Sequence, residues 1–126
     1  MRRFLLALLI LVFLVSGALF LQSRVNASAE ALLSVTERLE TALLSENAPL
    51  AQEGVDEFQT KWRTKKGWMY LLLPHEAMDD LESSAEYLSH SLTLRDFSGA
   101  LYALSHIRAD LNSIQSRDRL TWDNIL

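Results

Sequence analysis

The pattern of hydrophobic and polar residues divides the chain into one unbroken apolar run and a longer amphipathic remainder. The run, Phe4–Leu21, holds no charged side chain and is preceded by Arg2 and Arg3. At about 1.5 Å of rise per residue, a helix over these residues crosses most of a hydrocarbon core of roughly 30 Å. The run therefore predicts a membrane-spanning helix near the N-terminus.

Apolar residues in the remainder recur at spacings of three and four, which predicts four amphipathic helices. The residues that we expect in the core are Leu32, Val35, Leu39, Ala42 and Leu43 in the first helix; Val55, Phe58, Trp62 and Met69, with Leu72 or Leu73, in the second; Met78, Leu81, Ala85, Leu88 and Leu92 in the third; and Phe97, Leu101, Leu104, Ile107 or Arg108, Leu111 and Ile114 in the fourth. We therefore predict an all-α fold, in which a transmembrane signal-anchor helix precedes a small antiparallel bundle of about four helices, arranged as two αα-hairpins.

Polar turns separate these helices, and two boundaries stay open. Asn47 and Asp96 are the predicted N-caps of the second and fourth helices. The second helix either stops at Gly67, since glycine costs about 1 kcal/mol relative to alanine, or continues to the residue before Pro74. The residues that join the apolar run to the first amphipathic helix, 25–27, form either a rigid continuation or a hinge.

The two helical pairs share a pattern at an offset of 49 residues. The residues that align are Leu39 with Leu88, Leu43 with Leu92, Asn47 with Asp96, Ala51 with Ala100, Val55 with Leu104, Phe58 with Ile107 and Trp62 with Leu111. Each half is then a helix, a capped turn and a second helix, similar to an αα-hairpin of the tetratricopeptide type. We expect this shared form, and regard chance alignment of two amphipathic hairpins as its simpler origin.

The apolar run has two interpretations, an uncleaved signal-anchor and a cleaved signal peptide. Ala27-Ser28-Ala29 has the form of a cleavage site, and cleavage near Ala29 would release a secreted domain. Against cleavage, the run is long for a signal-peptide core, and Arg24 lies where a neutral approach to the peptidase is expected. We therefore prefer the anchor, with residues 1–24 as the membrane segment and residues 25–126 as an extracytoplasmic helical domain.

Charge indicates the orientation and the classes of partner. Arg2 and Arg3 precede the run and only Arg24 follows it closely, so the positive-inside rule predicts a cytoplasmic N-terminus. No later segment is long and apolar enough to span a membrane, so we expect a single-pass or a secreted protein. Without Arg2 and Arg3, ten basic residues stand against sixteen acidic ones, a formal net charge of −6. This balance argues against nucleic acid as a primary ligand. The chain has no cysteine, as is usual for exported proteins of low-cysteine bacteria, so its stability must come from packing.

His75, Glu76 and Asp79 form the best candidate cluster for chemistry. His75 and Asp79 lie one helical turn apart, and two such side chains could begin a metal site. A helix N-terminus that carries acidic residues explains the same pattern without a ligand, and we prefer that interpretation. The sequence has no metalloprotease, phosphate-loop or serine-nucleophile motif. We therefore expect no enzyme, no cofactor and no metal.

The stretch with the strongest indication of function is Gly67–Leu73, which is apolar on every face of a helix. A small bundle buries one stripe of each helix, so the surplus apolar residues of this stretch either form an exposed patch of the kind that contacts a partner or the membrane interface, or are covered by another part of the chain. The candidate interaction patch consists of Trp62, Trp68, Tyr70 and Leu71. The alternative is that the first helix or the tail, residues 115–126, covers the patch; we expect the tail to pack back on the bundle.

The chain also resembles a known family. The elements that carry the resemblance are a basic start and apolar anchor running into Gln22-Ser23-Arg24, a helix with Trp62 and Trp68, the pairs His75-Glu76 and Asp79-Asp80, and a leucine-rich helical pair that closes on Leu120-Thr121-Trp122-Asp123-Asn124-Ile125-Leu126. Over nearly its whole length the chain resembles a bacterial family of small, N-terminally anchored helical proteins, the domain of unknown function DUF4363. The resemblance implies an extracytoplasmic, membrane-tethered domain in an accessory role beside polytopic membrane proteins. Gly67 and Tyr70–Leu73 depart from the more charged composition of that family.

The function that we expect is a non-enzymatic accessory or interaction module in the bacterial cell membrane. It would bind another membrane or envelope protein through its helical faces, with Trp68 as an anchor residue. The runner-up is a secreted helical domain, released near Ala29, that binds a peptide or a small apolar ligand. A third hypothesis is a metal- or pH-responsive sensor built on His75 and Asp79. The sequence carries no indication of the oligomeric state.

Overall fold

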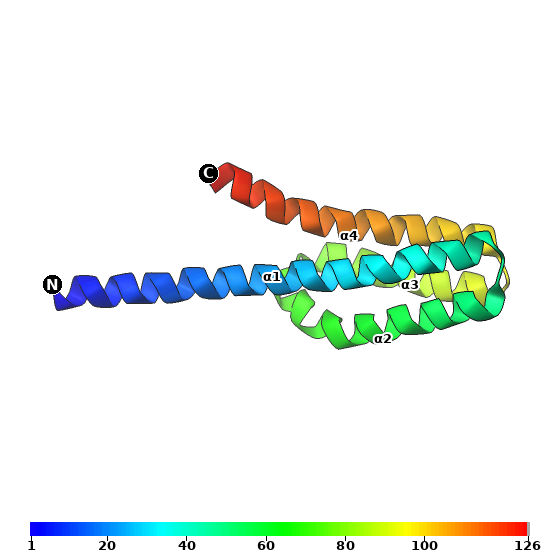
Figure 1. Ribbon diagram of the computed structural model, residues 1–126, viewed down its shortest axis with the longest axis horizontal. Coiled ribbons are helices and arrows are strands. Elements are labelled where there is room, and N and C mark those ends of the chain that lie inside the picture. The colour runs from blue at the N-terminus through cyan, green and yellow to red at the C-terminus, as the bar shows by residue number, and fades with distance from the viewer. Residues whose placement is uncertain (126) are drawn as a thin grey trace.

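The computed structural model describes the backbone of residues 1–125 and the side chains of residues 1–116. Within this range the chain forms four helices and no strand: α1 (Arg2–Leu44), α2 (Ala48–Leu72), α3 (His75–Thr93) and α4 (Phe97–Ile125). Each helix packs against the next along the chain, and α4 packs against α1, so the helices close into an antiparallel bundle (Figure 1). The predicted all-α fold is confirmed. The expected packing of the tail concerns side chains from residue 117 on, which lie outside the described residues.

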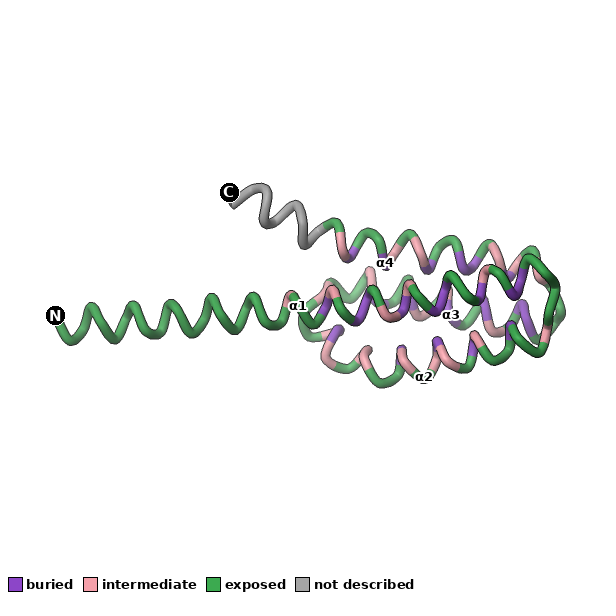
Figure 2. Tube along the Cα trace, in the orientation of Figure 1, coloured by how far each residue is buried: buried purple, intermediate pink, exposed green. Residues whose placement is uncertain are grey.

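α1 is one continuous helix of 43 residues that belongs to the bundle only in its C-terminal half. All residues up to Leu21 are exposed, and Val25 is the first buried residue (Figure 2). Between Gly17 and Leu44 the sequence has no glycine or proline, so no residue there breaks the helix. Of the two open possibilities for residues 25–27, the structure shows the continuous helix.

α2 passes through Gly67 and ends at Leu72. A Cβ at Gly67 would meet nothing within 4 Å, so this residue costs the helix only its backbone propensity, about 1 kcal/mol. Met69, which is fully buried, holds the following turn against the core. Pro74 then stops the helix, and the later of the two predicted ends is confirmed. Leu73 is half-buried and packs on the core, so it is Leu73 rather than Leu72 that extends the apolar stripe.

The core consists of one stripe from each helix. All predicted core positions of the first amphipathic stretch and of α3 are buried, while Phe97 and Leu101 of α4 are half-buried at the edge of the core. The core also contains small residues that the hydrophobic pattern does not single out. These are Ser28, Ala29, Ala100 and Ala103. Small side chains at such positions allow neighbouring helices to approach closely.

The two turns at one end of the bundle are capped in the same way. The Asn47 side chain accepts a hydrogen bond from the backbone N–H of Leu50 at 3.2 Å. The Asp96 side chain accepts one from the backbone N–H of Gly99 at 3.0 Å. Each bond satisfies one of the free N–H groups at a helix N-terminus. Both predicted N-caps are confirmed.

The backbone of these turns also repeats at the offset of 49 residues. Glu46 and Arg95 precede the two caps and adopt left-handed φ values of 54° and 59°, which non-glycine residues seldom do. Every aligned pair of apolar positions is buried in both halves: Leu39 and Leu88, Leu43 and Leu92, Ala51 and Ala100, Val55 and Leu104, Phe58 and Ile107, and Trp62 and Leu111. The two halves therefore share one hairpin form, and a common origin stays a hypothesis.

The two ends of the bundle differ in what they present. The capped turns at residues 45–47 and 94–96 lie together at one end, which we call the distal end (Figure 1). The α2–α3 turn at Leu73 and Pro74 lies at the opposite end, from which the apolar half of α1 projects. We call this second end the anchor end.

Candidate functional site

The apolar half of α1 is an uncovered apolar surface at the anchor end. Among the described residues, α1 is the helix long and apolar enough to cross a membrane, with a mean hydropathy of 3.0 over an 18-residue window and none of that window buried. The most apolar helix of a water-soluble bundle is normally buried in its core. The chain therefore carries a helix suited to be a membrane anchor or a signal sequence.

Arg24 connects the end of this apolar segment to the last turns of α2. Its guanidinium carbon lies 5.9 Å from the centre of the Phe20 ring and 5.8 Å from the centre of the Trp68 ring. Both distances are those of cation–π contacts. Trp68 therefore lies level with the turn of α1 that follows the apolar run.

The residues of the candidate patch differ in exposure. Trp62 is only 4% exposed and belongs to the core, so it adds nothing to a surface patch. Trp68 and Tyr70 are half-buried, and Leu71 is 85% exposed. Leu72, which the pattern offered as a core residue, is 42% exposed because α2 ends there. The exposed apolar side chains are those of Leu71 and Leu72; together with the half-buried Trp68 they form a surface that we call the α2 tip.

Tyr70 lies on the side of α2 that meets α3. Its hydroxyl lies 2.9 Å from Glu82 Oε2 and 3.1 Å from Asp79 Oδ1, so the two carboxylates share its single proton, and Lys66 Nζ donates to Glu82 Oε1 at 3.0 Å. Burial and the two carboxylate partners raise the pKa of the Tyr70 phenol. The hydrogen bonds from Lys66 and Tyr70 lower the pKa of Glu82. This polar network joins α2 to α3 beside the α2 tip.

His75, Glu76 and Asp79 lie exposed in the first turns of α3. The His75 ring is tilted against that of Tyr70, with 5.7 Å between the ring centres, and Asp79 accepts the Tyr70 hydroxyl. Within the part of the chain that the structure describes, no group of three or more histidine, cysteine, aspartate or glutamate side chains is arranged to hold a metal ion. The described partners of His75 and Asp79 thus serve the packing of α2 on α3.

Comparison with protein families shows which family has this sequence. The family model called Domain of unknown function (DUF4363) matches residues 19–125. The chain belongs to the DUF4363 family. The match begins inside the apolar run, so the DUF4363 domain includes the junction at which α1 enters the bundle. Comparisons with curated proteins and with solved structures gave no match for the chain.

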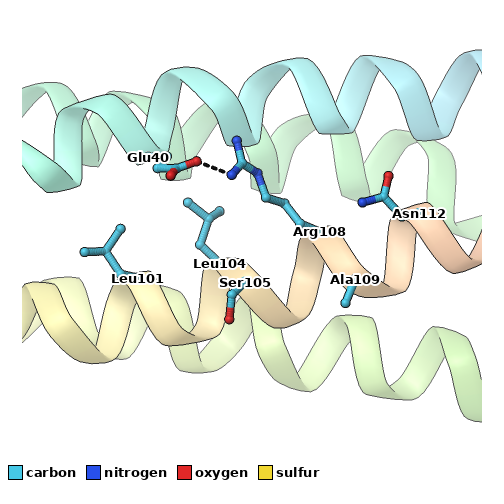
Figure 3. A pocket seen from close by; sticks show the side chains of 7 residues that line it. All are labelled: Glu40, Leu101, Leu104, Ser105, Arg108, Ala109 and Asn112. Atoms are coloured by element: carbon cyan, nitrogen blue, oxygen red, sulfur yellow. Dashed lines mark ion pairs between the residues drawn. The ribbon is translucent and has the colours of Figure 1, made fainter.

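A shallow groove of about 310 Å³ runs between α1 and α4 of this DUF4363 domain (Figure 3). Its lining residues are Glu40, Leu101, Leu104, Ser105, Arg108, Ala109 and Asn112. Arg108 crosses the groove to form an ion pair with Glu40, and its Nε donates to the Thr36 hydroxyl at 3.3 Å. Of the two residues that the pattern offered here, Ile107 is fully buried and takes the core position. Arg108 thereby ties α4 to α1.

The sequence of this DUF4363 chain did not indicate that two residues, Arg24 and Leu72, belong to the surface at the anchor end. Arg24 was considered as a charge that flanks the apolar run, and Leu72 as one of two candidates for a core position. Register could have found Arg24, because in an antiparallel hairpin residues equidistant from the turn face each other. Arg24 lies 22 residues before Glu46, and Trp68 lies 22 residues after it.

Proposed function

We propose that this DUF4363 protein is a non-enzymatic accessory or interaction module anchored in the bacterial cell membrane. Residues 1–24 form its anchor and residues 25–126 its extracytoplasmic domain. The observation that carries the proposal is the continuity of α1, whose exposed apolar half runs without a break into one of the bundle helices. Such a helix holds the bundle at a fixed height above the bilayer.

Retention of the anchor is supported by the packing of α1. Cleavage near Ala29 would remove Val25, Ser28 and Ala29, which are 8%, 5% and 0% exposed in the bundle. Full burial of a valine side chain alone stabilises a fold by about 1.5–3 kcal/mol. The family match also begins at residue 19, ahead of the cleavage-like site. A released domain would therefore lack part of its own core.

Topology follows from the flanking charges. Arg2 and Arg3 precede the apolar run and Arg24 alone follows it closely, so the N-terminus lies in the cytoplasm and the bundle outside it. The bundle then presents exposed apolar side chains at both of its ends. They are Leu71 and Leu72 at the anchor end, and Leu44, Leu50 and Leu94 at the distal end. Apolar positions of this kind serve contacts with partners, and we assign the distal end, which faces away from the bilayer, to another membrane or envelope protein.

The experiment combines topology with capture of a partner in living bacteria. A cysteine in place of Leu94, at the distal end, should react with a membrane-impermeant maleimide in intact cells; protection until the cells are lysed would contradict the topology. A photo-crosslinking residue at position 94 should capture one membrane or envelope protein repeatedly. The same residue at Glu53, which is exposed on α2, is the matched control and should not capture it. Equal capture from both positions would contradict a specific partner at the distal end.

A further inference from the structure

We propose that the α2 tip inserts into the headgroup region of the bilayer that holds α1 and forms a second point of attachment. The inference rests on the proposed membrane anchor and deepens it, because two attachments fix the tilt of the bundle where one helix fixes only its height. The occupant of this surface is lipid of the outer leaflet. The inference is carried by the depth of the tip, its exposure and its polar surroundings.

Depth follows from the antiparallel packing of α1 and α2. Trp68 lies beside Arg24, with 5.8 Å from the guanidinium carbon to the ring centre. From Trp68 onward, each residue of α2 advances about 1.5 Å toward the N-terminal side of α1. Leu71 and Leu72 therefore lie about 4.5 and 6 Å nearer the membrane than Trp68. This is the level of Leu21, the last residue of the apolar run.

The exposed apolar side chains of the tip are of the kind that lipid at this depth would contact. Leu71 is 85% exposed and Leu72 is 42% exposed, although both lie level with a segment that the bilayer covers. Trp68 stands one turn higher, where tryptophan favours the membrane–water interface. Arg24, level with Trp68, lies against the Trp68 and Phe20 rings, and long basic side chains place their charge in this way at the headgroup boundary.

The polar groups of Lys66 and Tyr70 beside the tip are occupied within the bundle. The Tyr70 hydroxyl is bonded to Asp79 and Glu82, and Lys66 is bonded to Glu82, so these side chains join α2 to α3. Glu76 and Asp79 lie exposed at the same end of the bundle, and they would repel anionic headgroups. Attachment therefore relies on insertion of apolar side chains and does not require anionic lipid.

Because the chain has no cysteine, a probe can be placed at one position without ambiguity. Full-length Leu71→Cys carries an environment-sensitive nitrobenzoxadiazole label and is reconstituted into phosphatidylcholine nanodiscs, which leave both faces open to solutes. Leu94→Cys is the matched control, since Leu94 is 65% exposed but lies at the distal end. We expect lipids with a nitroxide near the headgroup to quench the label at 71 several-fold more than the label at 94. Aqueous iodide should show the reverse order.

Each alternative outcome is distinct. If the protein enters nanodiscs but iodide quenches both labels equally and lipid quenches neither, insertion is wrong and the anchor stands. A label at 71 that is shielded from iodide without lipid quenching would mean that a second copy covers the tip, which also overturns the inference. Failure to enter nanodiscs would overturn the anchor and the inference together. Adding Leu72→Asp should lower lipid quenching at 71 at least two-fold while the helical circular dichroism is kept; unchanged quenching would count against the tip.

Discussion

Glu82 on α3 accepts hydrogen bonds from two side chains of α2 and so links the charge of one helix to its packing against the other. Lys66 and Tyr70 donate to its two oxygens at 3.0 and 2.9 Å, and these bonds hold its pKa below the ordinary value of 4.5. A carboxyl group with a lowered folded-state pKa contributes stability above its unfolded pKa and loses that contribution as the pH falls through the folded pKa. Because the ion-paired side chains are about a third exposed, the contribution is small.

We expect Glu82→Gln to lower the free energy of unfolding at pH 7 by less than about 1 kcal/mol. The difference from wild type should shrink as the pH falls through the lowered folded-state pKa of Glu82, because its carboxyl group then becomes neutral, as the glutamine is at every pH. Urea unfolding followed by circular dichroism at pH 7 and pH 3 measures it. Glu86→Gln, an exposed residue one turn further on α3, is the control. An equal difference at both pH values would show that the pairing of Glu82 contributes nothing.

Arg108 and Glu40 are expected to be coupled across the groove between α1 and α4. Their side chains are 31% and 35% exposed, so a double-mutant cycle with Arg108→Met and Glu40→Gln should give a coupling of about 0.5–1 kcal/mol in the free energy of unfolding. The control is a cycle of Arg108→Met with Glu37→Gln, because Glu37 lies exposed on α1, the helix of Glu40, but one turn away from it. The coupling in this control cycle should be near zero. Two cycles of equal size would contradict a specific ion pair.

At the scale of the elements, the repeated caps lead to a paired prediction. Asn47→Ala and Asp96→Ala should each lower the free energy of unfolding by about 1 kcal/mol, because each removes one bond to the third N–H of its helix. Asp96→Ala should cost slightly more, since its charge also favours the helix dipole. Thermal or urea unfolding measures both. Ser98→Ala, at an exposed position in the first turn of α4, should change little; a loss as large as that of the cap variants would contradict capping as the cause.

Helical periodicity predicted the elements well where packing and local preference agree. The stripe of α3 from Met78 to Leu92 is buried at every expected position. The course of the chain through Gly67 could not be predicted, because the local cost of about 1 kcal/mol is smaller than the gain from burying one neighbouring side chain such as Met69. Buried Ser28 escaped detection since a small polar residue carries no hydrophobic signal.

The candidate site was predicted less completely than the fold. Trp62 and Trp68 are the same residue type on the same helix, yet Trp62 fills the core and Trp68 lies at the surface of the anchor end. Composition alone cannot separate them, although the seven-residue spacing from Trp62 to Met69 places both on one stripe and Trp68 beside it. The choice between Leu72 and Leu73 stayed open because it depends on where α2 ends, and local pattern locates helix ends poorly; in the structure Leu73 is half-buried and packs on the core.

At the scale of the whole molecule, α1 combines an exposed apolar half and a half that packs in the bundle in one continuous helix. Its first half presents a fully exposed apolar surface, and its second half supplies core residues to the bundle from Val25 onward. The Arg24 contact places the end of α2 at the boundary between the two halves. With the proposed anchor, the bundle is therefore expected to sit directly on the membrane rather than to be held away from it by a flexible linker.

The most direct test of this account is the intact mass of the full-length protein, recovered from the membrane fraction of an exporting bacterium after carbonate extraction. We predict a chain that keeps its apolar run and stays in the carbonate-resistant membrane. A soluble product outside the cytoplasm with a mass that begins near Ala29 or Glu30 would contradict the membrane anchor and turn the search toward diffusible ligands of a released domain.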